Sequence, residues 1–242
     1  MAYYILNESL NRKILGKYPQ VENTVYSCDS WEDPRFIEHE SVSFEKVNFT
    51  PITAKAILAK KARLNDFMYP GGMGFSKKPL ISGKLKSILE VTDKQGLQIY
   101  NSPVIYQGNE IEDYWVLNPY IFDMQAIDFK NVDVYLMEKY VHKIKKLDVL
   151  TYEDFIKQKA MIQEKGYPYS IYIENVHILE NTTSDFLILE NVEGGVMYLV
   201  SERLKQHLEA EGITGIEYQP SYISFNEWLA KGGLREQLYG KA

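Results

Sequence analysis

The pattern of apolar and polar positions along the chain predicts a mixture of strands and helices. Apolar or alternating runs are typical of strands, and they occur at residues 3–6, 41–49, 114–117, 132–141, 169–178 and 186–189. Serine or threonine in front of apolar residues at helical spacing predicts helices that begin after Thr151, Ser201 and Ser224. Thr50-Pro51 predicts one more helix, because proline suits the first helical position. The expected fold is therefore α+β, with mixed or antiparallel sheets and flanking helices.

A strand-helix-strand unit occurs twice in the sequence. Residues 80–90 align without gaps with residues 199–209, and leucine, serine, lysine and glutamate recur at matching positions. Ser82 and Ser201 both stand where a helix N-cap belongs. Gly96 and Gly215 also coincide, after the helix, where a left-handed residue is often needed. We therefore expect an internal pseudo-duplication, with repeats at residues 80–104 and 199–223.

No low-complexity linker interrupts the chain, so the sequence predicts one continuous body over residues 1–242. Within it we distinguish an N-terminal segment (1–79), a central region that contains both repeats (80–223) and a C-terminal helix (224–242). With 45% hydrophobic residues, the chain can bury a core.

The net charge and the cysteine content exclude several classes of protein and of binding site. A net charge of −6 disfavours a general nucleic-acid binder, which needs a basic surface. The only cysteine, Cys28, excludes a disulfide within the chain and a tetrahedral cysteine site for zinc. No apolar run approaches the roughly 18 residues of a spanning helix, and no signal peptide precedes the first strand. The prediction is a cytoplasmic protein without membrane or nucleic-acid partners.

The residues that carry enzyme chemistry form no complete motif. The four histidines lack metal-ligand spacing, and no G-x-S-x-G elbow occurs, so we predict no catalytic residue, no metal and no cofactor. The glycine-rich loop 71–78 keeps two alternatives open. It is the one segment whose backbone could approach a phosphate, although it lacks a GK[ST] ending. An enzyme that processes a small molecule or nucleotide would gather Gly72, Gly74, Lys77 and a carboxylate in a pocket. A small-ligand binding module is the other alternative.

Tyrosine is abundant, with 19 residues, and it is enriched at protein interfaces. Two tyrosines flank the acidic loop at residues 107–113. An acidic surface would suit a basic protein partner. The sequence therefore predicts a protein-binding surface made of Tyr106, Glu110, Glu112, Asp113 and Tyr114.

Three stretches occur in a fixed order, namely the strand at residues 3–6, the segment 114–132 and the segment 198–218. Together they resemble a bacterial immunity-protein domain of polymorphic-toxin systems, first defined as a domain of unknown function in a myxobacterial protein. Their shared motif positions are Leu117-Asn118, Ile127-Asp128, Val200-Ser201, Leu204, Leu208 and the run from Gly215 to Tyr218. The long segment 7–75 and the insertion near 142–165 depart from the family pattern.

This resemblance implies a non-enzymatic cytoplasmic protein that binds and neutralises a cognate toxin. The matched positions are expected to serve as core, caps and turns, and not as toxin contacts.

Overall fold

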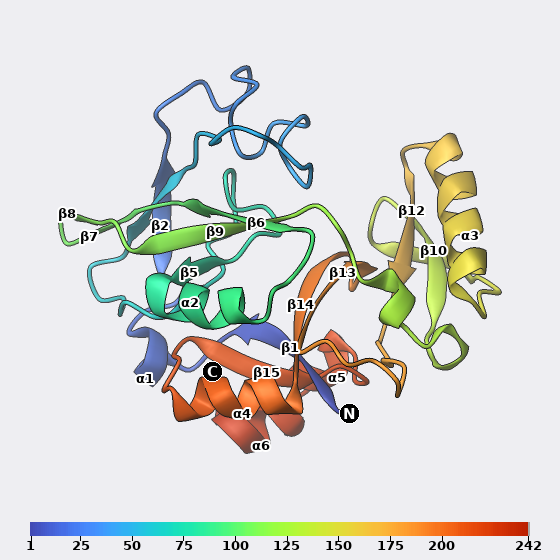
Figure 1. Ribbon diagram of the computed structural model, residues 1–242. Coiled ribbons are helices and arrows are strands. Elements are labelled where there is room, and N and C mark those ends of the chain that lie inside the picture. Colours follow the sequence, from blue (N-terminus) through green and yellow to red (C-terminus); the bar gives the residue numbers. More distant parts are fainter. Residues whose placement is uncertain (242) are drawn as a thin grey trace. The chain divides into compact units, whose positions relative to one another are not determined.

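The computed structural model describes residues 1–241 and has the predicted α+β fold, with three sheets and accompanying helices (Figure 1). The chain forms two compact units, each assembled from separated segments. The first comprises Met1–Leu6, Phe122–Arg203 and Tyr218–Leu238, and the second comprises Asn7–Ile121, Leu204–Glu217 and Tyr239–Ala242. Within the described residues, no helix has the length and apolarity needed to cross a bilayer.

A seven-stranded sheet dominates the first unit. Its strand order is β11 (His142–Lys146), β10 (Val134–Glu138), β12 (Tyr169–Ile173), β13 (Phe186–Val192), β14 (Gly195–Ser201), β1 (Tyr3–Glu8) and β15 (Ile216–Pro220). The pairings from β11 to β1 are antiparallel, except that β12 and β13 run parallel. The helices of this unit are η1 (Met124–Ala126), η2 (Phe129–Asn131), α3 (Tyr152–Lys165), α5 (Phe225–Leu229) and most of α6 (Leu234–Tyr239). Phe129 and Phe155 stack with ring centroids 5.2 Å apart in the buried core.

The second unit contains two four-stranded sheets. One has the order β2 (Val21–Val25), β3 (Lys55–Leu58), β7 (Val104–Tyr106), β8 (Asn109–Ile111). The other has the order β4 (Phe67–Met68), β5 (Leu80–Ser82), β9 (Tyr114–Pro119), β6 (Leu97–Asn101). Helices α1 (Arg12–Leu15), α2 (Gly83–Val91) and most of α4 (Glu202–Ala210) complete it. Its core includes the fully buried side chains of Phe36, Met68 and Phe75.

Both predicted repeats form strand, helix and strand, as β5-α2-β6 and β14-α4-β15. The duplication extends to the strand before each repeat. In the first copy Phe67 of β4 lies opposite Ile81. In the second copy Phe186 of β13 lies opposite Val200, and both residues are 119 positions further along the chain. Each copy therefore begins with a hairpin of the same register.

The fourth strand of each copy comes from a different place in the sequence. In the first copy Tyr114 of β9 lies opposite Ser82, and in the second copy Tyr3 of β1 lies opposite Ser201. The two strands read YWVLNP and YYILNE. Their tyrosine hydroxyls donate to equivalent carbonyls, of Asn65 at 3.0 Å and of Ser184 at 2.7 Å. The N-terminal strand is thus the closing strand of the second copy.

Two predicted elements are wrong. The helix expected after Pro51 is absent, and residues 55–58 form β3 instead. Ala56 and Leu58 alternate toward the buried side, and pairing with β2 and β7 satisfies the backbone. The strand expected at residues 41–49 is a series of turns, because the N–H groups of Val42 and Ser43 both donate back to His39 O.

The other predicted strands are present, but those expected at residues 132–141 and 169–178 are shorter, as β10 (Val134–Glu138) and β12 (Tyr169–Ile173). Helices begin after Thr151, Ser201 and Ser224 as predicted, but the C-terminal helix expected at residues 224–242 is divided into α5 and α6. Thr151 and Ser224 each form the predicted capping box.

Candidate functional site

A long loop at residues 26–54 joins β2 to β3 in the second unit. Its 29 residues form no helix and no strand, apart from an isolated bridge between Phe36 and Ile52. Figure 1 shows the loop rising above β2 as an irregular excursion. Loops longer than about 12–15 residues without secondary structure are uncommon in compact domains, and ordered ones usually carry function.

Two amide side chains fasten this loop to the sheet beneath it. Asn118 of β9 is fully buried; its Oδ1 accepts from Phe44 N at 3.0 Å, and its Nδ2 donates to Val42 O and Glu45 O, each at 3.1 Å. Gln98 of β6 accepts from Val47 N at 3.1 Å and donates to Val47 O at 2.7 Å. These bonds satisfy backbone groups that no strand partner satisfies, so the loop has a defined conformation.

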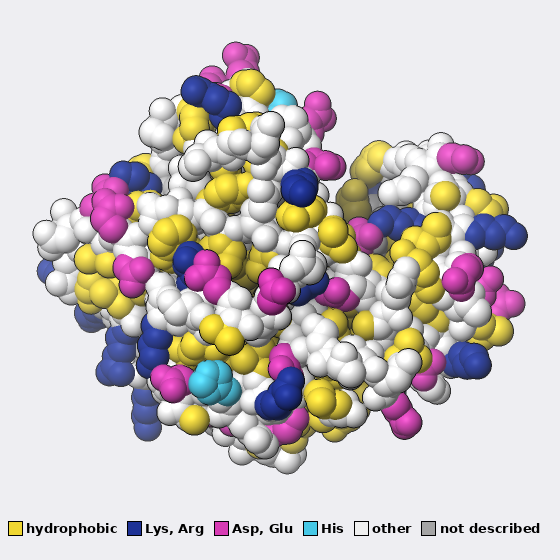
Figure 2. All heavy atoms as spheres, viewed as in Figure 1, with side chains coloured by type: hydrophobic (Ala, Val, Ile, Leu, Met, Phe, Trp, Pro, Cys, Tyr) yellow, Lys and Arg dark blue, Asp and Glu magenta, His cyan; other side chains and the backbone are white. Residues whose placement is uncertain are grey.

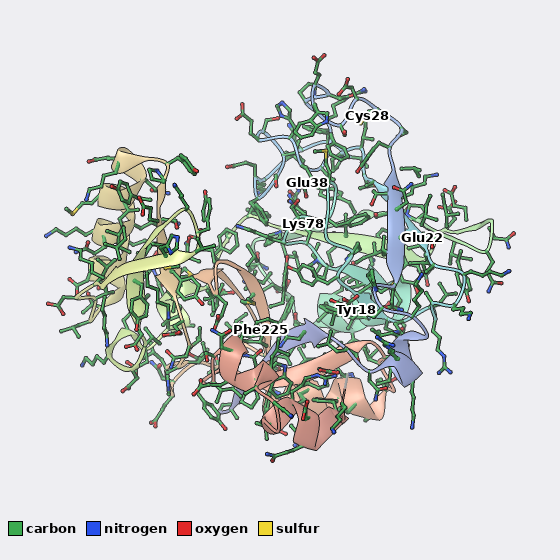
Figure 3. All side chains as sticks on the ribbon, turned by 180° about the vertical axis from the view of Figure 1, so that it is seen from behind. Tyr18, Glu22, Cys28, Glu38, Lys78 and Phe225 are labelled. Carbon is green, nitrogen blue, oxygen red and sulfur yellow. The ribbon has the colours of Figure 1, made fainter. Side chains whose placement is uncertain are left out.

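A buried lysine ties the loop to the glycine-rich segment. Lys78 is fully buried, and its Nζ lies 3.2 Å from Glu38 Oε1, 2.6 Å from Ser43 Oγ and 4.0 Å from the centre of the Phe44 ring. Burial lowers the pKa of Lys78, whereas the Glu38 carboxylate opposes that shift. Ser76 N also donates to Glu38 Oε1, at 3.1 Å. Figure 3 shows Glu38 and Lys78 side by side beneath the part of the loop that carries Cys28.

An open hollow of about 690 Å³ lies between the loop and the glycine-rich segment. It is lined by Ser30, Trp31, Glu38, His39, Glu40, Gly72, Met73 and Ser76. The Trp31 side chain is 79% exposed, the largest exposed aromatic group among the described residues. Its backbone is held in place, because Asp29 Oδ1 accepts from Trp31 N at 2.9 Å and from Glu32 N at 3.1 Å.

The segment at residues 21–50 carries most of the excess charge of the chain. It contains seven carboxylate side chains against one arginine and one lysine, which accounts for five of the six net negative charges. Figure 2 shows acidic side chains around this loop at the top of the view. The side chain of Glu40 is exposed.

The glycine-rich loop only partly matches the pocket expected for an enzyme. Gly72 lines the hollow beside Glu38 and Glu40, but Lys77 does not. Gly74 has a packing role, since an added Cβ would lie 2.3 Å from Ala54 Cβ at a φ of +95°. The glycine at this position therefore permits close contact with the long loop.

The predicted protein-binding residues lie around the β7–β8 hairpin. Tyr106 is half-buried and donates to Ala62 O at 3.0 Å. Glu110 forms an ion pair with Lys55 of β3, which offsets its charge. The carboxylate of Glu112 is exposed, and its backbone carbonyl accepts from Asn101 Nδ2 at 2.7 Å.

The other two predicted residues differ in accessibility. Asp113 is exposed and accepts from Trp115 Nε1 at 3.3 Å. Tyr114 is only 5% exposed, with its hydroxyl bonded to Asn65 O, so its inclusion in a binding surface is wrong. Burial raises the pKa of Tyr114, and Asp66 and Asp113 raise it further. The periodicity of β9 already places Tyr114 on the same side as Val116, which is fully buried.

Cys28 lies in the long loop and is half-buried. Burial raises the pKa of its thiol, and the negative charge of Asp33 acts in the same direction. A raised pKa keeps the sulfur protonated near neutral pH, which is the opposite of what a nucleophilic cysteine needs. Among the described residues, no three His, Cys, Asp or Glu side chains come together to hold a metal ion.

Comparison of the chain with protein-family models and with curated proteins gives no match.

Proposed function

We propose that this chain is an immunity protein that binds and neutralises a cognate bacterial toxin. The observation that carries the proposal is the long loop 26–54, which is fixed in conformation, is strongly acidic and carries an exposed tryptophan. A surface that is ordered before binding loses less conformational entropy on association. The loop thus has the properties of a recognition surface.

The duplicated scaffold also supports the proposal. Positions of the immunity-domain motif serve structural roles, as the resemblance implies. Asn118 fastens the loop, Val200 is buried in β14, and Leu204 and Leu208 are the buried residues of α4. The motif therefore accounts for the frame that presents the loop, while the loop belongs to the segment that departs from the family pattern.

Neutralisation would proceed by occlusion or distortion of the toxin's active site, without chemistry by this chain. Excess negative charge on one loop would attract a basic toxin and speed the encounter, and salt would screen this attraction. The dissociation rate of the complex would then be set by the residues at the buried centre of the interface.

The test is to express this chain with the product of the adjacent gene. The proposal expects co-purification of the two proteins and survival of cells that express the adjacent product as a toxin. Absence of binding together with absence of rescue overturns it.

A second candidate function is the binding of a small ligand in the hollow beside Gly72. The volume of about 690 Å³ lies within the range of known ligand pockets, roughly 300–1,000 Å³. A thermal-shift screen with nucleotides, sugars and amino acids tests it, since a ligand that binds only the folded chain raises the Tm. If none of these compounds changes the Tm, small-ligand binding in the hollow is excluded.

A further inference from the structure

We propose that the hollow beside Trp31 receives an arginine or lysine side chain of a basic protein partner. This inference rests on the proposed function and names the part of the surface that would make the central contact. The hollow, and not the β7–β8 hairpin, would then be the main recognition site.

The chemistry of the lining favours a cation on a flexible apolar stem. Trp31 offers the aromatic face that attracts a guanidinium or ammonium group most strongly. Met73 and the indole provide apolar surface for the methylene groups of such a side chain. Glu40 lines the same hollow with an exposed carboxylate. An acidic partner would instead meet repulsion.

Glu38 also lines the hollow, but it is mostly buried and paired with Lys78, so the exposed carboxylate of Glu40 supplies the acidic group. Both hydrogen bonds to Glu38, from Ser76 N and Lys78 Nζ, go to Oε1. Lys78 Nζ lies 3.2 Å from Glu38 Oε1, so its charge offsets that of Glu38, as Lys55 offsets that of Glu110. Arg35, the one arginine of the loop, is engaged by Asp33 through a 2.9 Å contact.

The hairpin is a weaker candidate for the same partner. Glu110 is already paired with Lys55, and Tyr114 is buried. Trp31 has far more accessible apolar surface than Tyr106, which is half-buried. Tryptophan and arginine are the residues most often found at the energetic centre of an interface.

The decisive variant combines Trp31→Ala with Glu40→Gln, both at exposed positions that the fold does not need. A matched control combines Tyr140→Ala with Glu164→Gln in the first unit, which also removes one exposed aromatic ring and one exposed carboxylate. Circular dichroism and thermal unfolding first establish that both variants fold.

If the adjacent gene product binds, its affinity is measured for wild type, both variants and the hairpin variant with Glu110→Gln and Glu112→Gln. The hollow variant is expected to bind at least about tenfold more weakly, while the control and hairpin variants stay within about threefold. Unchanged affinity in the hollow variant overturns the inference and leaves the proposed function standing.

If the adjacent gene product does not bind, the proposed function fails and the hollow is tested separately. Wild type and the hollow variant are used to select binders from a random dodecapeptide library displayed on phage. The inference expects selected peptides rich in arginine and lysine for the wild type, with at least about tenfold less recovery on the hollow variant. Selection of no peptides, of peptides without basic residues, or of the same peptides by both proteins overturns it.

Discussion

Ser82 Oγ donates a 2.7 Å hydrogen bond to Asp66 Oδ1 and accepts one from Leu85 N at 3.2 Å. The hydroxyl therefore joins the start of α2 to the residue that precedes β4. The second copy has the same arrangement, in which Ser201 Oγ donates to Asp185 Oδ1 at 2.5 Å. The backbone repeats it as well, with Ser82 N to Asp66 O at 2.9 Å and Ser201 N to Asp185 O at 2.8 Å.

Replacing Ser82 by alanine should destabilise the protein by about 1–2 kcal/mol, because the helix loses its cap and Asp66 loses a donor. Ser87→Ala on the exposed side of the same helix serves as the control and should change stability by less than about 0.5 kcal/mol. Urea unfolding followed by circular dichroism measures both. Equal effects of the two substitutions would contradict the role assigned to the Ser82 hydroxyl.

Gly215→Ala should be severely destabilising, by about 3 kcal/mol or more, through overpacking added to backbone strain. An added Cβ would lie 2.2 Å from the carbonyl oxygen of Phe67, and φ is +90°. Gly212 separates the two effects, since its φ is +67° but no atom lies within 4 Å of an added Cβ. Gly212→Ala should therefore cost only about 1 kcal/mol. A similar fall in Tm for both variants would show that the contact with Phe67 is unimportant.

Asn118→Ala should release the long loop from the sheet. Phe44 N and Glu45 O would lose their partner, and Val42 O would keep only its bond from Glu45 N, at a total cost of about 2–4 kcal/mol. Limited proteolysis should then cut near residues 42–47 faster than in the wild type. Asn109→Ala, at an exposed position on β8, is the control and should leave the cleavage rate unchanged. Protection of the loop in Asn118→Ala would mean that other contacts hold it.

Glu8 makes the stability of the fold depend on pH. Burial raises its pKa from 4.5 to about 7, although its Oε1 accepts from Tyr69 N at 3.1 Å. The folded state therefore holds this proton more tightly than the unfolded state. The contribution of Glu8 to stability therefore falls as pH rises from about 4.5 to about 7. Above pH 7 the folded state bears the full cost of burying the ionised carboxylate.

Glu8→Gln keeps an acceptor for Tyr69 N and removes the ionisation. We expect it to stabilise the protein at pH 8, by up to about 3 kcal/mol, and to have little effect at pH 4.5. Thermal unfolding of both proteins across this range measures the difference. A stability difference that is independent of pH would show that the carboxyl group does not titrate in this way.

Local patterns predicted much of the fold. The caps at Thr151 and Ser224 depend on residues three positions apart, so sequence spacing reveals them. The repeated Ser82 and Ser201 are likewise local signals. β1 could not be assigned to the second copy in this way, because Tyr3 and Ser201 meet only in the folded chain. The helix predicted after Pro51 does not form, because residues 55–58 pair as β3 with β2 on one side and with β7 on the other.

The candidate site was less accessible to sequence reasoning. The acidic run around Glu110 is conspicuous in the sequence, yet the neutralising Lys55 lies on another strand. Trp31 is exposed because of the way the turns of the loop are arranged. Hydrophobic periodicity does not predict this arrangement. One signal was available without a structure. The concentration of negative charge in residues 21–50 marks the long loop as unusual.

The position of β1 between β14 and β15 has a consequence for biosynthesis. This strand is translated well before its neighbours, which lie at residues 195–201 and 216–220. The second copy therefore cannot close until residue 220 has been translated, whereas all four strands of the first copy are complete at residue 119. Removing this strand would consequently open a sheet whose other members all begin at residue 134 or later.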